Sequence, residues 1–255
     1  MQIAIPSYRR SHTVFEKTIS ALVRSGVPLD NVTVFISDPE EHDAYVSGTG
    51  NMVKVVDSVP TLAGNRNFIL DYYPQGEKIL FLDDDIVSFE KLSTDGKRLI
   101  PDTNVLAFAE KGFDWCEKQG KSLWGIYAAR NYFFMDNDVT EGLHYIIGSC
   151  YGIINRKKSF QRVEFDEKED YLRTLKHFDK EKGVVRLNYI TVNTAYYKEQ
   201  GGMQETRTNE RVERYAKILA QEYPDYCKAY VSKGKGTWEL RLATSTYKKK
   251  LLETI

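Results

Sequence analysis

Three consecutive carboxylates, Asp83, Asp84 and Asp85, follow directly on the apolar run Lys78–Leu82. Three adjacent acids repel one another unless a cation or a proton neutralises them. Mg²⁺ and Mn²⁺ prefer carboxylate oxygens and leave coordination positions for phosphate oxygens. Because ligands of open α/β sheets bind at the carboxyl ends of strands, the triplet predicts a site for a divalent metal and a phosphorylated ligand. The alternative is a solvated acidic turn.

The elements that must position this triplet alternate between strands and helices. Short apolar runs predict strands, and apolar residues three and four positions apart predict helices. In the first 90 residues we expect strands at Gln2–Pro6, Asn31–Ser37, Met52–Asp57 and Lys78–Leu82, and helices at Thr13–Ser25 and Ala63–Tyr73. This alternation implies βαβ units, and therefore an α/β fold with a mostly parallel central sheet flanked by helices.

The second half of the chain is less regular, but it carries no linker and no repeat that would mark another domain. It predicts helices at Asp102–Gln119, Glu167–Asp179 and Thr208–Tyr223, and strands at Leu123–Ala128, Tyr145–Asn155 and Val184–Thr194. We therefore expect a single domain over residues 1–255. Residues 1–90 would form a nucleotide-binding half and residues 91–255 an acceptor-binding half with a C-terminal helix and a basic tail.

Composition excludes several classes of protein. With 42% hydrophobic and 28% charged residues and a net charge of zero, the chain is typical of a globular protein and has no overall field that would attract nucleic acid. Its three cysteines form no close pair, the N-terminus lacks the pattern of a signal peptide, and no apolar run could span a membrane. We expect a cytoplasmic protein.

The order of four motifs resembles that of family-two GT-A glycosyltransferases. The motifs are a strand ending in a Pro-x-Tyr turn, an acid after the second strand, an Ala-x-x-Arg-Asn helix and an Asp-x-Asp cluster, here Ile3–Arg9, Ser37-Asp38, Ala63–Asn67 and Phe81–Asp85. The resemblance covers about the first 90 residues. It implies transfer of a sugar, such as glucose, from a nucleotide-sugar to a hydroxyl acceptor.

The resemblance also assigns roles to residues of this chain. Pro6, Ser7, Tyr8, Arg9 and Asp38 would bind the nucleoside, Asn65 and Arg66 would face the nucleotide, Asp84 would contact the donor, and Asp83 and Asp85 would bind Mn²⁺ or Mg²⁺. A tyrosine face suits a uracil-like base, and arginines suit phosphate. The alternatives are a strand-end aromatic for Tyr8 and a solvated helix charge for Arg66. No histidine stands where many relatives place a late metal ligand.

Two later stretches also resemble GT-A segments. Gly148 and Gly152, in the run 148–156, would let the backbone approach the sugar, although a strand bulge explains them equally well. Glu169-Asp170 resembles the acidic pair that supplies the general base in inverting members, and we favour Asp170 over Glu169. The alternative is a pair of acids that stabilise a helix N-terminus.

The acceptor is predicted from a weaker likeness. The whole chain resembles the TET/JBP-associated glycosyltransferases of bacteriophages, which implies 5-hydroxymethylpyrimidine in DNA as acceptor and the host cytoplasm as location. A basic and aromatic C-terminal region suits phosphate and base contacts, namely Tyr226, Lys228, Tyr230, Lys233, Lys235, Trp238, Arg241, Tyr247 and Lys248–Lys250. The alternative is a solubilising tail. The polar stretch Lys198–Thr208 predicts a lid over the donor.

Other functions stay open on sequence alone. An apolar strand followed by Asp83, Asp85 and Val87 also fits the nucleophile motif of haloacid-dehalogenase-type phosphatases. The acceptor of a transferase could instead be a glycan or a small molecule. A module that only binds nucleotide-sugar or DNA is the non-enzymatic alternative. Gly120-Lys121-Ser122 imitates a P-loop but follows a helix, where a phosphate-binding loop must follow a strand.

Overall fold

The computed structural model describes residues 1–195, 207–234 and 236–243 and is built around an eight-stranded sheet of order β3-β2-β1-β4-β9-β7-β10-β8. Its strands are β1 Gln2–Ser7, β2 Val32–Ile36, β3 Lys54–Asp57, β4 Lys78–Leu82, β7 Leu123–Ile126, β8 Val139–Gly142, β9 Cys150–Ile154 and β10 Val184–Leu187. β1–β4 are mutually parallel, β7 and β10 share their direction, and β8 and β9 run against it. The expected mostly parallel sheet is confirmed.

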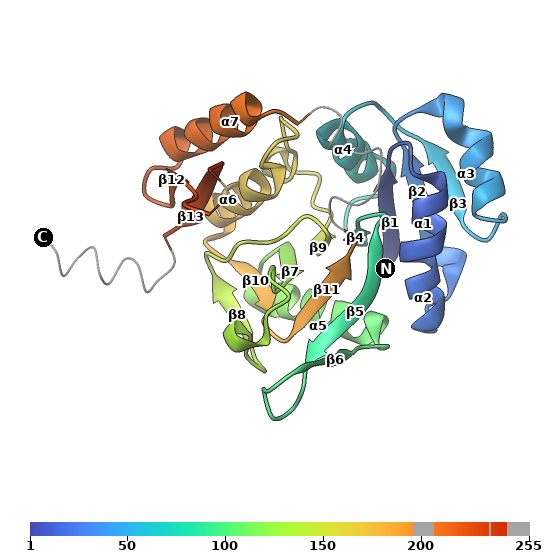
Figure 1. The fold of residues 1–255 in the computed structure, drawn as a ribbon, viewed down its shortest axis with the longest axis horizontal. Coiled ribbons are helices and arrows are strands. Elements are labelled where there is room, and N and C mark those ends of the chain that lie inside the picture. The colour runs from blue at the N-terminus through green and yellow to red at the C-terminus, as the bar shows by residue number, and fades with distance from the viewer. Residues whose placement is uncertain (196–206, 235, 244–255) are drawn as a thin grey trace, which may run out of the picture.

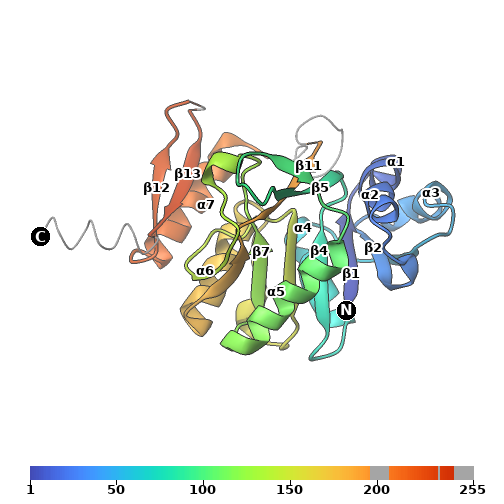
Figure 2. The ribbon, with the colours of Figure 1, turned by 90° about the horizontal axis from the view of Figure 1, so that it is seen from below.

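Helices cover both faces of this sheet (Figures 1 and 2). They are α1 Ser11–Val14, continued through a π-helical turn Phe15–Ile19 into α2 Ser20–Arg24, then α3 His42–Gly48, α4 Leu62–Tyr72, α5 Val105–Gln119, α6 Glu169–Glu181 and α7 Asn209–Glu222. No helix among the described residues has the length and apolar character needed to cross a membrane.

The alternation of side chains along the central strands separates two hydrophobic clusters. In β4, Leu80 and Leu82 point into one cluster with residues of α2 and α5, whereas Ile79 and Phe81 point into another with residues of α4. All four side chains are almost fully buried. A parallel strand that is buried on both faces must be apolar throughout, which is why the run Lys78–Leu82 could be located from the sequence.

The second half differs from expectation in two places. The stretch Tyr145–Asn155 is a strand only at Cys150–Ile154, because the backbone N–H of Ile146 donates to Thr174 Oγ1 of α6 and the carbonyl of Gly148 accepts from Arg66. These side chains replace the partners that a neighbouring strand would offer. Residues 145–149 therefore form a loop.

The stretch Val184–Thr194 is divided into β10 and β11 Ile190–Thr194 by a turn at Asn188 and Tyr189. The side chain of Asn188 donates to Asp138 Oδ1 at 2.6 Å, and its own backbone N–H donates to the Asp138 carbonyl. β11 then joins a separate sheet of order β11-β5-β6, with β5 Ile86–Leu92 and β6 Leu99–Pro101. The three aspartates occupy the link between β4 and β5.

The last described elements form a further layer. α7 and the hairpin of β12 Cys227–Val231 and β13 Trp238–Leu242 pack against α6, sharing a cluster that includes Leu172, Leu219 and Leu240. Figure 1 shows this layer at the end of the molecule away from α1–α3. Most of the predicted lid, 198–206, and the basic residues Lys248–Lys250 lie outside the described residues.

Candidate active site

A cavity of about 970 Å³ lies at the carboxyl ends of β1, β2 and β4. The N-terminal part of α4, the loop 145–149 and the first turn of α6 complete its wall, together with β11, β13 and the start of α7. Of the residues predicted to form the site, the cavity is lined by Pro6, Ser7, Tyr8, Asn65, Arg66, Asp83, Asp84, Asp85, Gly148, Glu169 and Asp170. The fold therefore brings together residues that are up to 164 positions apart, from Pro6 to Asp170.

The middle aspartate of the triplet is held by the protein itself. Ser7 Oγ donates to Asp84 Oδ2 at 2.6 Å, and Arg10 Nη1 donates to Asp84 Oδ1 at 2.9 Å. Asp84 is 5% exposed, so these bonds replace water at both carboxylate oxygens. Its observed role is to anchor the turn after β1 to the turn after β4.

The outer aspartates are the candidate metal ligands. Asp83 accepts from Arg66 Nη2 at 3.1 Å, and the carbonyl of Asp85 accepts from the Ala195 N–H. Burial raises the pKa of the Asp83 carboxyl to about 7 against the attraction of Arg66, and Asp85 adds to the rise. Two hard carboxylates with mutual repulsion fit a divalent cation whose other ligands are phosphate oxygens and water. The described residues contain no ready-made cluster of three protein ligands.

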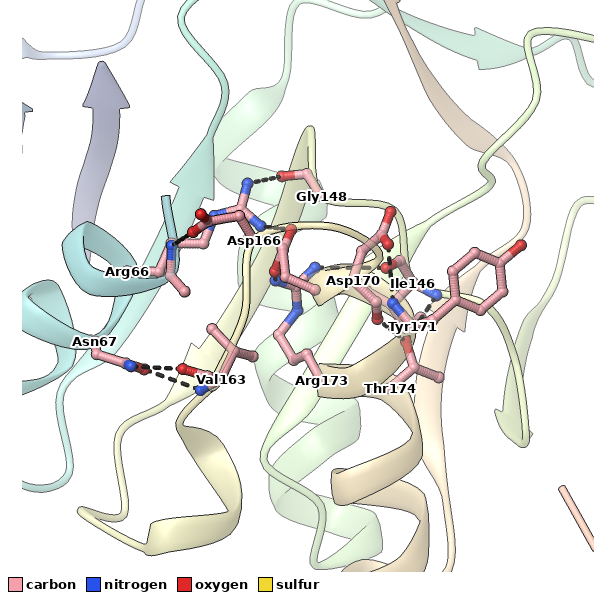
Figure 3. Close-up of polar contacts among 12 residues, drawn as sticks. Arg66, Asn67, Ile146, Gly148, Val163, Asp166, Asp170, Tyr171, Arg173 and Thr174 are labelled. Carbon is pink, nitrogen blue, oxygen red and sulfur yellow. Dashed lines mark hydrogen bonds and ion pairs between the residues drawn. The ribbon is translucent and has the colours of Figure 1, made fainter. Parts of the chain in front are cut away.

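Arg66 lines the cavity, but its guanidinium is bound within the wall. It donates to Asp83 Oδ1, to the Gly148 carbonyl at 3.2 Å and to Glu169 Oε1. Figure 3 shows this side chain reaching from α4 to the Gly148 carbonyl. A guanidinium in the protein interior needs such acceptors, and Arg66 is only 4% exposed. It therefore joins the acidic triplet to the start of α6 rather than standing as the solvated helix charge.

The two acids of the predicted catalytic pair have different surroundings. Glu169 is ion-paired through Oε1 with Arg66 and through Oε2 with Arg173 Nη1 at 2.6 Å. Asp170 accepts from the Tyr145 hydroxyl and from the Tyr171 N–H at 2.9 Å. Burial, followed by the nearby charge of Glu169, raises the pKa of Asp170 above its ordinary value, although the bond from Tyr145 opposes the rise. The carboxylate of Glu169 is thus held by two guanidiniums, whereas that of Asp170 accepts from a hydroxyl and a backbone N–H.

Two residues predicted to bind the nucleoside lie outside the cavity wall. Asp38 caps the 3₁₀ turn Pro39–Glu41 by accepting from the Glu40 N–H, and it lies 3.5 Å from an Arg9 guanidinium nitrogen. The Arg9 side chain is half exposed and lies over the ring of Tyr8. Arg9 adopts a φ of 54° in the bend that follows β1, and the next residue, Arg10, lines the cavity.

The two glycines predicted to contact the sugar, Gly148 and Gly152, lie in different surroundings. A Cβ atom on Gly148 would lie 3.0 Å from Glu169 Oε1 and 3.2 Å from the Arg66 nitrogens, so its small size permits the ion pair in the cavity wall. A Cβ atom on Gly152 would lie 2.1 Å from Trp124 Nε1, inside the hydrophobic core. The donor-binding role of Gly152 is therefore corrected to one in packing β9 against α5 and β7.

The structure adds residues that sequence reasoning missed. Arg10 and Tyr145 reach the cavity, and neither lies in a motif that distinguishes it from its neighbours. The two arginines after the Pro-Ser-Tyr turn could have indicated Arg10. Which of Arg9 and Arg10 faces the cavity, however, depends on the geometry of the turn. None of the four histidines is among the lining residues.

The fold is that of the GT-A glycosyltransferases. A mannosyltransferase from Pyrobaculum calidifontis, in complex with GDP-mannose and Mn²⁺, superimposes with a TM-score of 0.54 and 14% identity over 88% of this chain and 63% of its own. A glucosyl-3-phosphoglycerate synthase from Mycobacterium tuberculosis, in complex with Mn²⁺ and UDP-glucose, superimposes with a TM-score of 0.50 and 11% identity. The match covers 94% of this chain and 85% of the synthase.

A Staphylococcus aureus TarS structure gives a TM-score of 0.48 and 15% identity over 74% of this chain. The chain spans 60% of that structure and 63% of the mannosyltransferase. No protein-family model and no curated protein sequence matches it. At these identities the likeness defines the fold.

Proposed function

We propose that this protein is a metal-dependent glycosyltransferase that moves a sugar from a nucleotide-sugar, with a uridine diphosphate leaving group, to a hydroxyl acceptor. One observation carries the proposal. A single cavity is lined by two carboxylates suited to a divalent cation, Asp83 and Asp85, and by a separate carboxylate with a raised pKa, Asp170. The complexes of two proteins of the same fold with Mn²⁺ and a nucleotide-sugar support it.

Different residues of the cavity would serve different steps of such a transfer. Asp83 and Asp85 would hold Mn²⁺ or Mg²⁺, and the cation would offset the negative charge that develops on the departing diphosphate. Tyr8 and Asn65, which line the cavity, would face the nucleotide, and Arg10 brings permanent positive charge near the acidic triplet. Asp170 would take the proton of the acceptor hydroxyl as its oxygen attacks the anomeric carbon.

Nucleotide binding gives the first test of this assignment. We expect uridine diphosphate to raise the melting temperature only when Mn²⁺ or Mg²⁺ is present, because the outer aspartates repel a diphosphate in the absence of a cation. A ligand at 100 times its dissociation constant stabilises the native state by about 2.7 kcal/mol. Differential scanning fluorimetry with and without EDTA measures the effect. An equal shift without metal, or no shift with any nucleoside diphosphate, contradicts the proposal.

For the acceptor, we propose 5-hydroxymethylpyrimidine in DNA. The supporting observation is the β12–β13 hairpin, in which Lys228 lies opposite Arg241 and Tyr230 is 38% exposed. The neighbouring Glu239 of β13 lines the cavity, so this basic and aromatic surface adjoins the site. Cations and exposed rings suit the backbone and bases of nucleic acid, and a base in a duplex must leave the stack to enter a cavity.

The acceptor proposal is tested by mass spectrometry of DNA. Hydroxymethylated DNA is incubated with the protein, Mn²⁺ and a panel of nucleotide-sugars, and unmodified DNA is the control. A mass increase of one hexose on the modified base alone is expected. Hydrolysis of the donor without transfer to DNA would support a glycosyltransferase but contradict the DNA acceptor. The acceptor would then be a glycan or a small molecule.

The phosphatase alternative loses its support. Three parallel strands precede the acidic strand in the chain, and the fold is GT-A. The buried ion pairs around Glu169 and the raised pKa of Asp170 also go beyond what nucleotide binding alone requires. They favour the enzyme over a module that only binds nucleotide-sugar or DNA.

A further inference from the structure

We infer that Glu169 is a positioning residue that couples the donor side of the cavity to the acceptor side. This inference rests on the proposed function, in which Asp83 serves the donor and Asp170 serves the acceptor. Glu169 was predicted as half of a catalytic pair, and the structure separates its role from that of its neighbour.

Both carboxylate oxygens of Glu169 are occupied by cations. Oε1 accepts from Arg66 Nη1, and Oε2 accepts from Arg173 Nη1 at 2.6 Å. The three side chains are only 2–6% exposed. Each oxygen of this carboxylate thus serves as a counter-charge to a buried guanidinium, which is the work of a positioning residue.

Arg66 carries the effect of Glu169 to the donor side. Its other guanidinium nitrogen, Nη2, donates to Asp83 Oδ1 at 3.1 Å and to the Gly148 carbonyl at 3.2 Å. A Cβ atom on Gly148 would meet both Glu169 and Arg66, so the ion pair is enclosed on this side. Glu169 therefore decides how closely Arg66 approaches Asp83.

Arg173 carries the effect to the acceptor side. It lies one helical turn after Glu169 in α6, and its guanidinium lies 3.6 Å from the centre of the Tyr151 ring. Figure 3 shows Arg173 and Asp170 on the first turns of α6, beside the loop that contains Ile146 and Gly148. The pair Glu169–Arg173 thus fixes the turn of the helix from which Asp170 faces the cavity.

Loss of the Glu169 charge has a defined consequence. Arg66 keeps one carboxylate partner, Asp83, and a buried guanidinium that loses a counter-charge moves toward the remaining one. A closer Arg66–Asp83 pair competes with a divalent cation for the same oxygens. In addition, α6 loses the ion pair that orients its first turn. We therefore expect one substitution to weaken cation binding and to slow transfer.

The test compares Glu169→Gln with Glu181→Gln in the full chain. Glu181 is a matched control at the far end of α6, because it is also buried and also paired, with Arg156 at 3.1 Å and with Ser122, but it does not line the cavity. Three quantities are measured for the wild type and both variants. They are the Mn²⁺ affinity by calorimetry, kcat and KM for each substrate, and the exchange rate of the Arg66 guanidinium protons by NMR.

We expect Glu169→Gln to weaken Mn²⁺ binding roughly tenfold or more, to lower kcat, and to speed exchange of the Arg66 protons. Glu181→Gln should lower stability and leave all three unchanged. If Glu169→Gln loses kcat with unchanged Mn²⁺ affinity and unchanged Arg66 exchange, Glu169 is the base and the inference is overturned. If the two variants behave alike, the ion pair serves stability alone. A wild-type protein that binds no Mn²⁺ and no nucleotide refutes the proposed function instead, and the NMR comparison still decides whether Glu169 holds Arg66.

Discussion

The Asp85→Ala variant is expected to lose sugar transfer while it stays folded. Asp85 lines the cavity in the link between β4 and β5, and its removal leaves Asp83 as the one outer carboxylate of the triplet. A metal that offsets charge in the transition state contributes several kcal/mol, so we expect a fall in kcat of at least about 100-fold. The measurement is the rate of nucleoside diphosphate release with saturating Mn²⁺, with circular dichroism to verify the fold.

The matched control for this variant is Asp84→Asn. Asp84 is bound at both oxygens by Ser7 and Arg10, so neutralising it breaks the buried Arg10–Asp84 ion pair and should destabilise the protein by about 3–5 kcal/mol. The loss should appear mainly in the melting temperature. Full turnover by a well-folded Asp85→Ala protein, or by the wild type in EDTA, would remove the metal role from the triplet.

The Asp170→Asn variant should abolish transfer and leave donor affinity nearly unchanged. The amide keeps the shape of the side chain and loses its basicity, so the chemical step slows, by about 10²–10⁴-fold for a general base. In the wild type, burial and Glu169 raise the pKa of Asp170. The rate should therefore rise with pH through a value above that of an ordinary aspartate, as the base loses its proton, and this limb should vanish in the variant.

Two controls separate Asp170 from its neighbours. Tyr145→Phe removes a hydrogen bond that lowers the pKa of Asp170. The transfer rate of this variant should therefore rise at a higher pH than that of the wild type. Glu169→Gln should reduce transfer less than Asp170→Asn. An inactive Glu169→Gln beside an active Asp170→Asn would reverse the assignment within the pair. If both stay active, the two acids only begin a helix.

The first half of the fold could be predicted because its periodicity is strong. The expected strand Lys78–Leu82 matches β4, and the helix Ala63–Tyr73 differs from α4 by one residue at each end. In the second half, contacts between residues far apart in the sequence override the secondary structure that the local pattern predicts. The run 145–149 reads as a strand but pairs with side chains of α6 and α4, and a single sequence carries no record of such contacts.

For the site as well, the sequence predicts its position but not the contacts that depend on the fold. The sequence places the three aspartates at the end of a strand, and the cavity is there. It could not reveal that Asp84 is held by Ser7 and Arg10, because those bonds depend on the turn after β1. Gly148 and Gly152 look equivalent in the sequence, yet one lies in the cavity wall and the other in the core, because the strand begins between them.

The contacts between α4 and the start of α6 have a consequence for modularity. The N-terminal end of α4 is capped from 103 residues away, by the Ala63 N–H donating to Asp166 Oδ1 at 2.8 Å, and Arg66 on the same helix depends on Glu169. A fragment of residues 1–90 would contain every nucleotide-binding motif and would still lack the acceptor of the Ala63 N–H and the Glu169 partner of the buried Arg66. The two halves should therefore unfold in one cooperative transition, and neither could be exchanged between enzymes as an independent cassette.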